Sequence, residues 1–261
     1  MTEFRRIPDD YGMAFLTTAW KITKKHYEMI LGTSLIILVV VFALSMVPYL
    51  GLLASIPALI LGIGQMRVVR GLIEGRKVQI SEVFYIFQDQ KLLSQVMPLA
   101  LSGVVIAILQ YGVTKFTANN AFFTMVGSLV NLFLLLTWLA LTAFSGPLIA
   151  FRGHSFADSI DMNIKATTLN WWPLLLFAIM LLGFGLICLI VFFLPVIFIF
   201  LPTMFVTSYL CYAAMFENLD VVALAKTLYA NAVAKLRLQT VDRCDLQTVS
   251  KVVFPRGLLF Q

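Results

Sequence analysis

Charged residues are missing from long parts of this sequence. Asp, Glu, Lys and Arg make up 12% of the 261 residues, whereas hydrophobic residues make up 61%. Residues 29–66 and 171–216 contain no charge, and Lys115 is the single charge in residues 92–151. Such long uncharged runs are typical of transmembrane helices and exclude an ordinary soluble domain.

Cysteine and histidine are also scarce. The cysteines Cys188, Cys211 and Cys244 are far apart, and the histidines His26 and His154 stand alone. This spacing favours neither a disulfide framework nor a metal site. The sequence also lacks a nucleophile elbow, a phosphate-binding loop and a zincin motif. We therefore expect no catalytic residue, no metal and no other cofactor, and a protein that is not an enzyme.

A cleavable signal peptide is not evident either. Residues 1–28 carry several Arg and Lys residues but no short apolar core followed by a small-residue cleavage site. We expect the first membrane hairpin to serve as the insertion signal.

The uncharged runs are too long for single membrane crossings. A straight helix over residues 29–66 would extend about 57 Å at about 1.5 Å per residue, whereas the hydrocarbon layer is about 30 Å thick. The run must fold back, and Val47-Pro48-Tyr49-Leu50-Gly51 supplies a turn. The same reasoning predicts six helices in three hairpins, near residues 29–47, 50–67, 92–113, 121–150, 173–193 and 196–216.

A short amphipathic segment precedes each hairpin, near residues 11–25, 80–90 and 155–170. The apolar positions of these segments are Phe15, Leu16, Ala19 and Trp20; Ile80, Val83, Phe84 and Phe87; and Phe156, Ile160 and Ile164. Their spacing predicts surface helices, the second with Ser81 available as its N-cap. The expected fold is all-α: a polytopic membrane protein of six transmembrane helices as three hairpins, each preceded by a cytoplasmic amphipathic helix.

This pattern divides the chain. Residues 1–216 are expected to form a single six-helix transmembrane domain of three units, near residues 11–67, 80–150 and 155–216. At an offset of 145 between the first and third units, Pro57 falls on Pro202, which indicates an internal repeat. A cytoplasmic helical tail is expected over 217–252, and residues 253–261 loosely resemble protease-cleavage sequences used to remove tags.

The charges predict an orientation. If both termini and both charged loops share one side, that side holds every one of the 19 Lys and Arg residues except Lys115, and all 13 acidic residues. By the positive-inside rule this side is cytoplasmic. The net charge of +6 therefore follows the membrane and does not indicate a nucleic-acid partner.

The chain resembles an uncharacterised family of six-helix bacterial inner-membrane proteins, akin to the membrane domains beside some glycerophosphodiester phosphodiesterases. The resemblance covers residues 11–216. The motifs that carry it are Arg67-Val68-Val69-Arg70-Gly71-Leu72, Glu74-Gly75-Arg76, Ser81-Glu82-Val83-Phe84 and Asn170-Trp171-Trp172-Pro173. It implies a multi-pass protein of the bacterial inner membrane, and it implies no known activity.

Two groups of residues are candidate sites. Within the spans the strongest polar groups include Asn131, Gln65 and Gln110. Hydrogen bonding between helices is the first interpretation of these amides, and the lining of a substrate path is the alternative. At the cytoplasmic boundary lies the second group: Arg67, Arg70, Arg76 and Lys77, with Trp171 and Trp172 expected at the same level. These cations either set topology alone or bind anionic lipid headgroups or an acidic partner segment.

Two functions fit these features. The first is a non-enzymatic scaffold or accessory protein of a partner complex, because the external loops are short and no buried charge is expected. It would have a protein partner or form a homo-oligomer. The alternative is a transporter or lipid-handling protein that uses a cavity between the hairpins. A polar cavity that reaches Asn131 would favour the alternative.

Overall fold

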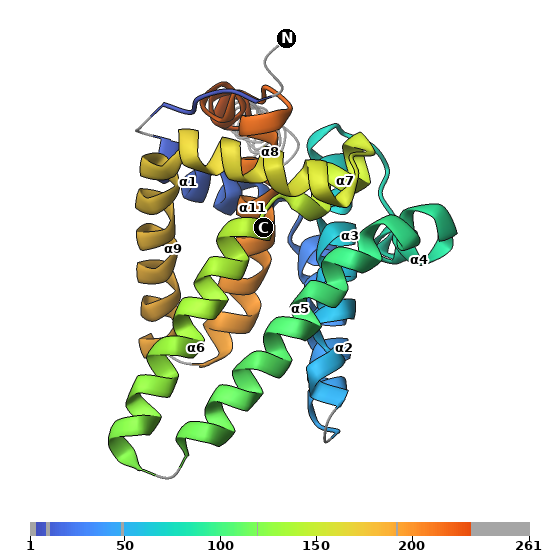
Figure 1. Cartoon of the computed structure of the whole chain (residues 1–261). Helices are drawn as coiled ribbons and strands as arrows, with labels where there is room; N and C mark the ends of the chain where they lie inside the picture. Colours follow the sequence, from blue (N-terminus) through green and yellow to red (C-terminus); the bar gives the residue numbers. More distant parts are fainter. Residues whose placement is uncertain (1–3, 9–10, 48–49, 119, 192, 231–261) are drawn as a thin grey trace, which may run out of the picture. The chain divides into compact units, whose positions relative to one another are not determined.

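The computed structural model describes residues 4–8, 11–47, 50–118, 120–191 and 193–230. The described residues form helices and no strands, so the expected all-α class is confirmed (Figure 1). Six of the helical segments are long and apolar enough to cross a membrane, as predicted. They are Tyr27–Ser45, Leu50–Ile73, Gln90–Thr117, Ala121–Arg152, Trp171–Val191 and Val196–Phe216.

The elements follow one another with short connections. In chain order they are α1 (Tyr11–Lys25), α2 (Tyr27–Ser45), η1 (Leu50–Leu53), α3 (Ser55–Ile73), η2 (Ile80–Phe84), α4 (Tyr85–Gln88), α5 (Gln90–Thr117), α6 (Ala121–Thr142), α7 (Ser145–Arg152), α8 (Phe156–Leu169), α9 (Trp171–Val191), α10 (Phe193–Pro195), η3 (Val196–Phe200, a π-helix) and α11 (Leu201–Phe216).

The chain separates into two compact units at Val221. A short apolar helix, Val221–Ala230, begins at this boundary and continues into the second unit. The rest of the expected tail, the sequence 253–261 and Cys244 lie outside the described residues.

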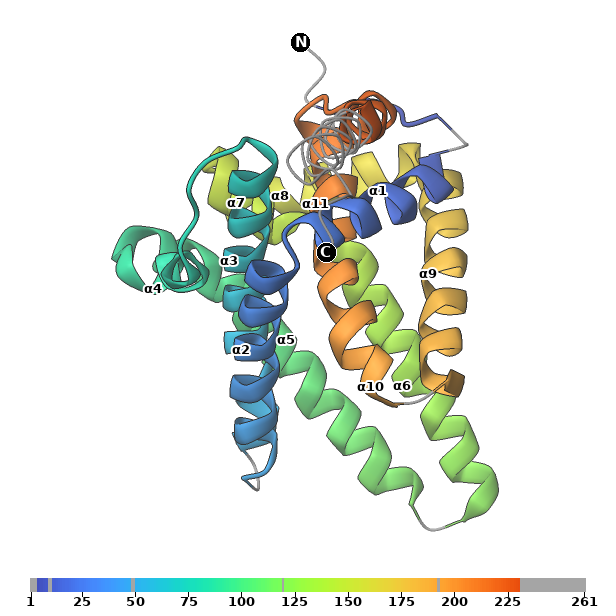
Figure 2. The same cartoon turned by 180° about the vertical axis from the view of Figure 1, so that it is seen from behind.

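Helices α3 and α11 lie at the centre of the first unit. Helix α3 packs against α2, α5 and α11, whereas α11 also packs against α1. Every residue from Tyr209 to Phe216 of α11 is buried. Helices α2, α5 and α9 run toward one end of the unit, and α3, α6 and α11 run back (Figures 1 and 2). The ends of α3, α7 and α11 therefore lie at the same end as α1 and α8.

Helix α3 is longer than its uncharged stretch predicts. It was expected to end near residue 67 but continues to Ile73, so Arg67 and Arg70 lie on its last turns. Glu74 is the C-cap, and Gly75 follows it with a φ of 74°, a left-handed conformation that glycine adopts without strain. The Arg76 amide then donates to the Gly71 carbonyl at 2.9 Å. Hydropathy marks where the polar region begins, but this turn decides where the helix ends.

The segment after α3 folds back against it. A 3₁₀-helix and one α-turn replace the continuous amphipathic helix expected over residues 80–90. Val83 of the 3₁₀-helix and Ile86 of the α-turn are buried, whereas Ile80 and Phe87 are exposed. The N-cap is Gln79 rather than Ser81, because Glu82 Oε1 accepts from the Gln79 amide at 3.3 Å.

The fourth span is broken near its C-terminal end. One helix was expected over residues 121–150, but α6 stops at Thr142 and α7 starts at Ser145. Asn163 on α8 occupies the break: its Nδ2 donates to the Ala140 carbonyl at 2.7 Å, and its Oδ1 accepts from the Phe144 amide at 3.0 Å. Asn163 thus satisfies backbone groups that the missing turn would have paired.

Candidate functional site

Three arginines surround a cavity at the ends of α3 and α7. Arg67 and Arg70 come from the last turns of α3, and Arg76 comes from the connection that follows it. Together with Glu74 and Phe151 they line a cavity of about 290 Å³, called the arginine cavity below. Three of the four cations singled out in the sequence, Arg67, Arg70 and Arg76, are therefore brought together around one space.

Each of these arginines is paired with a carboxylate. Arg70 lies 2.9 Å from Glu74 and 3.3 Å from Glu217. The other pairs are Arg76–Glu74 at 2.9 Å, Arg67–Glu82 at 3.6 Å and Arg76–Glu82 at 3.9 Å. The cluster is therefore a network of three guanidiniums and three carboxylates. Isolated exposed pairs contribute little to stability, but a shared network fixes the positions of its side chains.

Glu74 is the centre of this network. Its Oε1 accepts from Arg70 Nε and its Oε2 accepts from Arg76 Nε, both at 2.9 Å. The hydrogen bond from Arg70, together with that from Arg76, lowers the pKa of Glu74 below its ordinary value. The carboxylate is therefore ionised at neutral pH.

Aromatic rings support two of the guanidiniums. Arg67 lies 4.3 Å from the centroid of the Tyr85 ring, and Arg70 lies 5.5 Å from that of Phe151. Such cation–π contacts hold the planar groups in place while leaving their edges free to bind. Burial raises the pKa of Tyr85 to about 12, although the nearby Arg67 acts in the opposite direction.

Helix α11 reaches the same network through Glu217. This carboxylate accepts from the Tyr209 hydroxyl at 2.9 Å and pairs with Arg70. Beside it, Arg152 at the end of α7 lies 5.9 Å from the Phe216 ring. The ends of α3, α7 and α11 thus meet around the arginine cavity, each at the end of a long apolar segment.

The other predicted surface residues lie elsewhere. Lys77 is exposed and does not line the arginine cavity. Trp171 and Trp172 begin α9, where their rings form an edge-on pair 5.4 Å apart, and both are exposed. The start of α9 lies at the same end of the unit as the end of α3 (Figure 1). The tryptophans share this end with the arginines but not the cavity.

The intramembrane amides bond neighbouring helices. Asn131 Nδ2 donates to the Thr114 hydroxyl at 2.9 Å, and Gln110 Nε2 donates to the Asn131 carbonyl at 3.0 Å, which joins α5 to α6. Gln65 Nε2 lies 3.3 Å from both the Ile30 carbonyl and the Ser34 hydroxyl, which joins α3 to α2.

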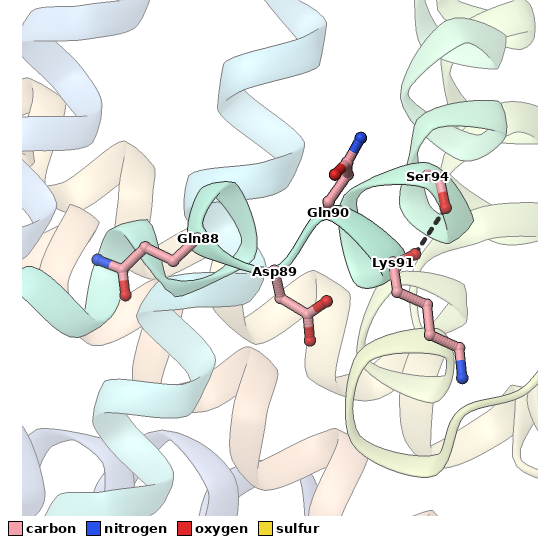
Figure 3. Close-up of a pocket in the computed structure, with 5 residues that line it drawn as sticks. All are labelled: Gln88, Asp89, Gln90, Lys91 and Ser94. Carbon is pink, nitrogen blue, oxygen red and sulfur yellow. Dashed lines mark hydrogen bonds between the residues drawn. The ribbon is translucent and has the colours of Figure 1, made fainter.

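Two further hollows are less suited to binding. An open depression of about 780 Å³ lies at the junction of α4 and α5 (Figure 3). Its side chains, Gln88, Asp89, Gln90 and Lys91, point in different directions, and Asp89 caps α5 by accepting from the Leu92 amide at 3.1 Å. An apolar hollow of about 240 Å³ lies between α9 and the start of the last span.

Part of the arginine cavity was readable in the sequence and part was not. The spacing of Arg70 and Glu74, four residues apart, indicates a pair on one helix face. Nothing in the sequence places Phe151 or Glu217 beside them, because both arrive from other spans. Within the described residues, no three His, Cys, Asp or Glu side chains gather in a way that could hold a metal ion.

Comparison with known proteins finds no match for the chain among protein-family models, curated proteins or solved structures.

Proposed function

We propose that this protein is a non-enzymatic scaffold or accessory protein of a partner complex in the bacterial inner membrane. Its six spans form three hairpins that enter from the cytoplasmic face, each preceded by an amphipathic helix, and both termini are cytoplasmic. The positive-inside bias supports this orientation. The family resemblance described in the sequence analysis supports a location in the bacterial inner membrane.

The exposure of α6 carries this proposal. Gly127 and Thr142 are its buried residues, while the large side chains are exposed around the helix, Phe133 by 69%. Its main contact within the bundle is with α5, and its end contacts α7 and α8. A span held mainly by one neighbour leaves most of its surface for lipid or for a helix of another protein. Packing and interhelical hydrogen bonds then drive association in the membrane.

A photocrosslinking experiment tests this proposal. A photoreactive amino acid at Phe133 of α6 should give one discrete protein adduct in native membranes, whereas the same group at the exposed Ile190 of α9 should give lipid adducts. The adduct mass distinguishes a second copy of the chain from a different protein. Lipid adducts alone at both positions, with no copurifying protein, would exclude α6 as a partner surface.

Element bounds support the internal repeat. Adding 145 to the bounds of α1, α2 and α3 gives 156–170, 172–190 and 200–218. Helices α8, α9 and α11 have the bounds Phe156–Leu169, Trp171–Val191 and Leu201–Phe216. Parallel repeats of this kind are related by an axis along the membrane normal.

The arginine cavity favours a second function, lipid handling. In this proposal Arg67, Arg70, Arg76 and Lys77 bind anionic headgroups, and Trp171 and Trp172 lie at the same depth of the cytoplasmic leaflet. Replacement of Arg76 and Lys77 by Gln should lower the anionic lipid that copurifies, as measured by mass spectrometry. Unchanged lipid with unchanged topology would leave these cations with a topological role alone.

The hydrogen bonds of Asn131 argue against a transport path through this residue. Its amide nitrogen binds Thr114 and its backbone carbonyl binds Gln110, so these groups join two helices of one pair. Asn131 also does not line any of the three hollows described above. We therefore place lipid handling at the arginine cavity rather than between the spans.

A further inference from the structure

We propose that the arginine cavity is a phosphate-binding site and that the Glu74 carboxylate occupies the anion position until a ligand displaces it. This inference rests on the lipid-binding proposal above and adds an internal competitor to it. The ligand class is a phosphate monoester, either as a lipid headgroup or as a free anion.

The bonds of Glu74 have the pattern that a phosphate would form. One carboxylate oxygen binds Arg70 Nε and the other binds Arg76 Nε, each at 2.9 Å. A phosphate also presents two oxygens to two guanidiniums, and planar guanidiniums bind carboxylates and phosphates with the same geometry. The two donors are therefore already spaced for an oxyanion.

Arg67 provides a third cation on the cavity wall. Its Nε is buried and donates no hydrogen bond in the structure, although it lies 3.6 Å from Glu82. The Arg67 side chain as a whole is nevertheless 43% exposed and lines the cavity, so an anion with more oxygens than a carboxylate meets a third guanidinium there. A phosphate has three terminal oxygens for three arginines, whereas Glu74 has two for Arg70 and Arg76.

Of the three carboxylates, Glu74 is the one that can leave. Its side chain is 43% exposed, whereas those of Glu82 and Glu217 are 21% and 20% exposed. Glu82 also binds the Gln79 amide, and Glu217 also binds Tyr209, so both are held by a partner other than an arginine. Glu74 has bonds to the two arginines, so rotation of its side chain into water frees the Nε donors of Arg70 and Arg76.

Charge balance makes this exchange selective. With Glu74 in place, three arginines face three carboxylates and the network is neutral. When Glu74 turns away, a net positive charge remains on the cavity wall, and an anion restores the balance. A zwitterionic headgroup brings a cation with its phosphate and restores less. Phosphate monoesters, which carry no cation and present three terminal oxygens to the three arginines, should bind best.

Native mass spectrometry of the purified full-length chain in neutral detergent tests the inference. Phosphatidic acid and phosphatidylcholine with the same acyl chains are titrated, with inorganic phosphate as a separate arm. Glu74→Gln should tighten phosphatidic acid binding about tenfold relative to wild type, because the competitor is gone. Glu74→Asp, which is too short to reach both arginines, should also tighten binding while keeping the charge. Arg76→Gln should weaken it.

Asp161→Asn is the matched control. Asp161 forms an exposed pair with Lys165 at 2.6 Å on α8, so the change removes the same charge away from the cavity. Its phosphatidic acid affinity should equal that of wild type. If Asp161→Asn and Glu74→Gln raised the phosphatidic acid affinity equally, the net charge of the protein would explain the effect and the inference would be overturned. Thermal unfolding of each variant checks that the fold persists.

The remaining outcomes separate the two proposals. If Arg76→Gln weakens lipid binding but neither Glu74 variant strengthens it, the lipid site stands and the competitor role of Glu74 is overturned. If no variant changes binding, both proposals fail. Competition by inorganic phosphate supports a free anion as the ligand, and binding that phosphate cannot displace supports a lipid headgroup. Both results need the same three arginines.

Discussion

Gly64 is the residue on which the packing of η2 against α3 depends. A Cβ atom at this position would overlap the carbonyl oxygen of Val83 and lie 2.7 Å from its carbonyl carbon. Because the obstacle is backbone, it cannot rotate away as a flexible side chain would. The buried face of Val83 then packs with Leu61 and Val68. Because Gly64 has no side chain, the segment that carries Glu82 can pack against α3.

The first prediction compares two glycines of this helix. Gly64→Ala should destabilise the protein by about 1–3 kcal/mol, because it overfills a packed site. Gly62→Ala should be neutral or stabilising by up to about 1 kcal/mol, because the added methyl group would meet only the Phe205 ring, at 4.0 Å, and alanine favours a helix. Thermal unfolding in detergent measures both. Equal changes in stability would show that the contact between Gly64 and Val83 does not restrict the size of the side chain at this position.

The sequence could predict that glycines in these spans serve close packing, but not which of them do. Gly62 and Gly64 are two residues apart on one helix and look alike in the sequence. Their difference is set by Val83, which arrives from a connection whose path no local pattern specifies. Arg70 and Glu74 are the contrary case, because their spacing on one helix is enough to predict their pairing.

Among the elements, α6 and α7 show how a distant residue sets a helix boundary. Residues 121–150 are apolar throughout and predict one helix. Asn163, on α8, pairs the backbone at Ala140 and Phe144, so the break depends on a side chain about 20 residues later. The break turns α7 toward α3 and α5, against which it packs. That direction brings Phe151 to the arginine cavity.

The second prediction tests this break. Asn163→Ala removes both hydrogen bonds and leaves the buried Phe144 amide unpaired, which should cost about 1–3 kcal/mol of stability. The change should also weaken anionic lipid binding, since Phe151 would no longer be fixed beside Arg70. Thr167→Ala on the same helix is the control, because its buried hydroxyl has no hydrogen-bond partner. Unfolding midpoints that match in the two variants would contradict this role of Asn163.

At the scale of the first unit, much of the architecture can be predicted from the sequence. The long uncharged runs are enough to predict six helices that could cross a membrane. The arginine cavity is different, since its walls come from α3, the following connection and α7, with Glu217 of α11 behind them. Sequence reasoning selected Arg67, Arg70 and Arg76 as a basic patch. It did not foresee that three carboxylates would neutralise them, because tertiary packing brings Glu217 to Arg70.

The last prediction concerns orientation. In a parent with Cys244 replaced by Ser, an impermeant thiol reagent is applied to intact spheroplasts of cells that express the chain. The remaining cysteines, Cys188 and Cys211, are buried, and the unmodified parent measures their background. Ala118→Cys lies beyond the end of α5 and should react from outside. Lys91→Cys, at the start of the same helix, should react only after lysis.

Labelling at Lys91 and Ala118 tests whether α5 crosses the membrane and in which direction it does so. Both residues are exposed, so burial does not explain a difference in labelling. They lie at opposite ends of the 28-residue helix α5, which at about 1.5 Å per residue is longer than the hydrocarbon layer is thick. Labelling of Lys91→Cys from outside with Ala118→Cys protected would reverse the topology and place the arginine cavity outside. Labelling of both in intact spheroplasts would show that α5 does not cross the membrane.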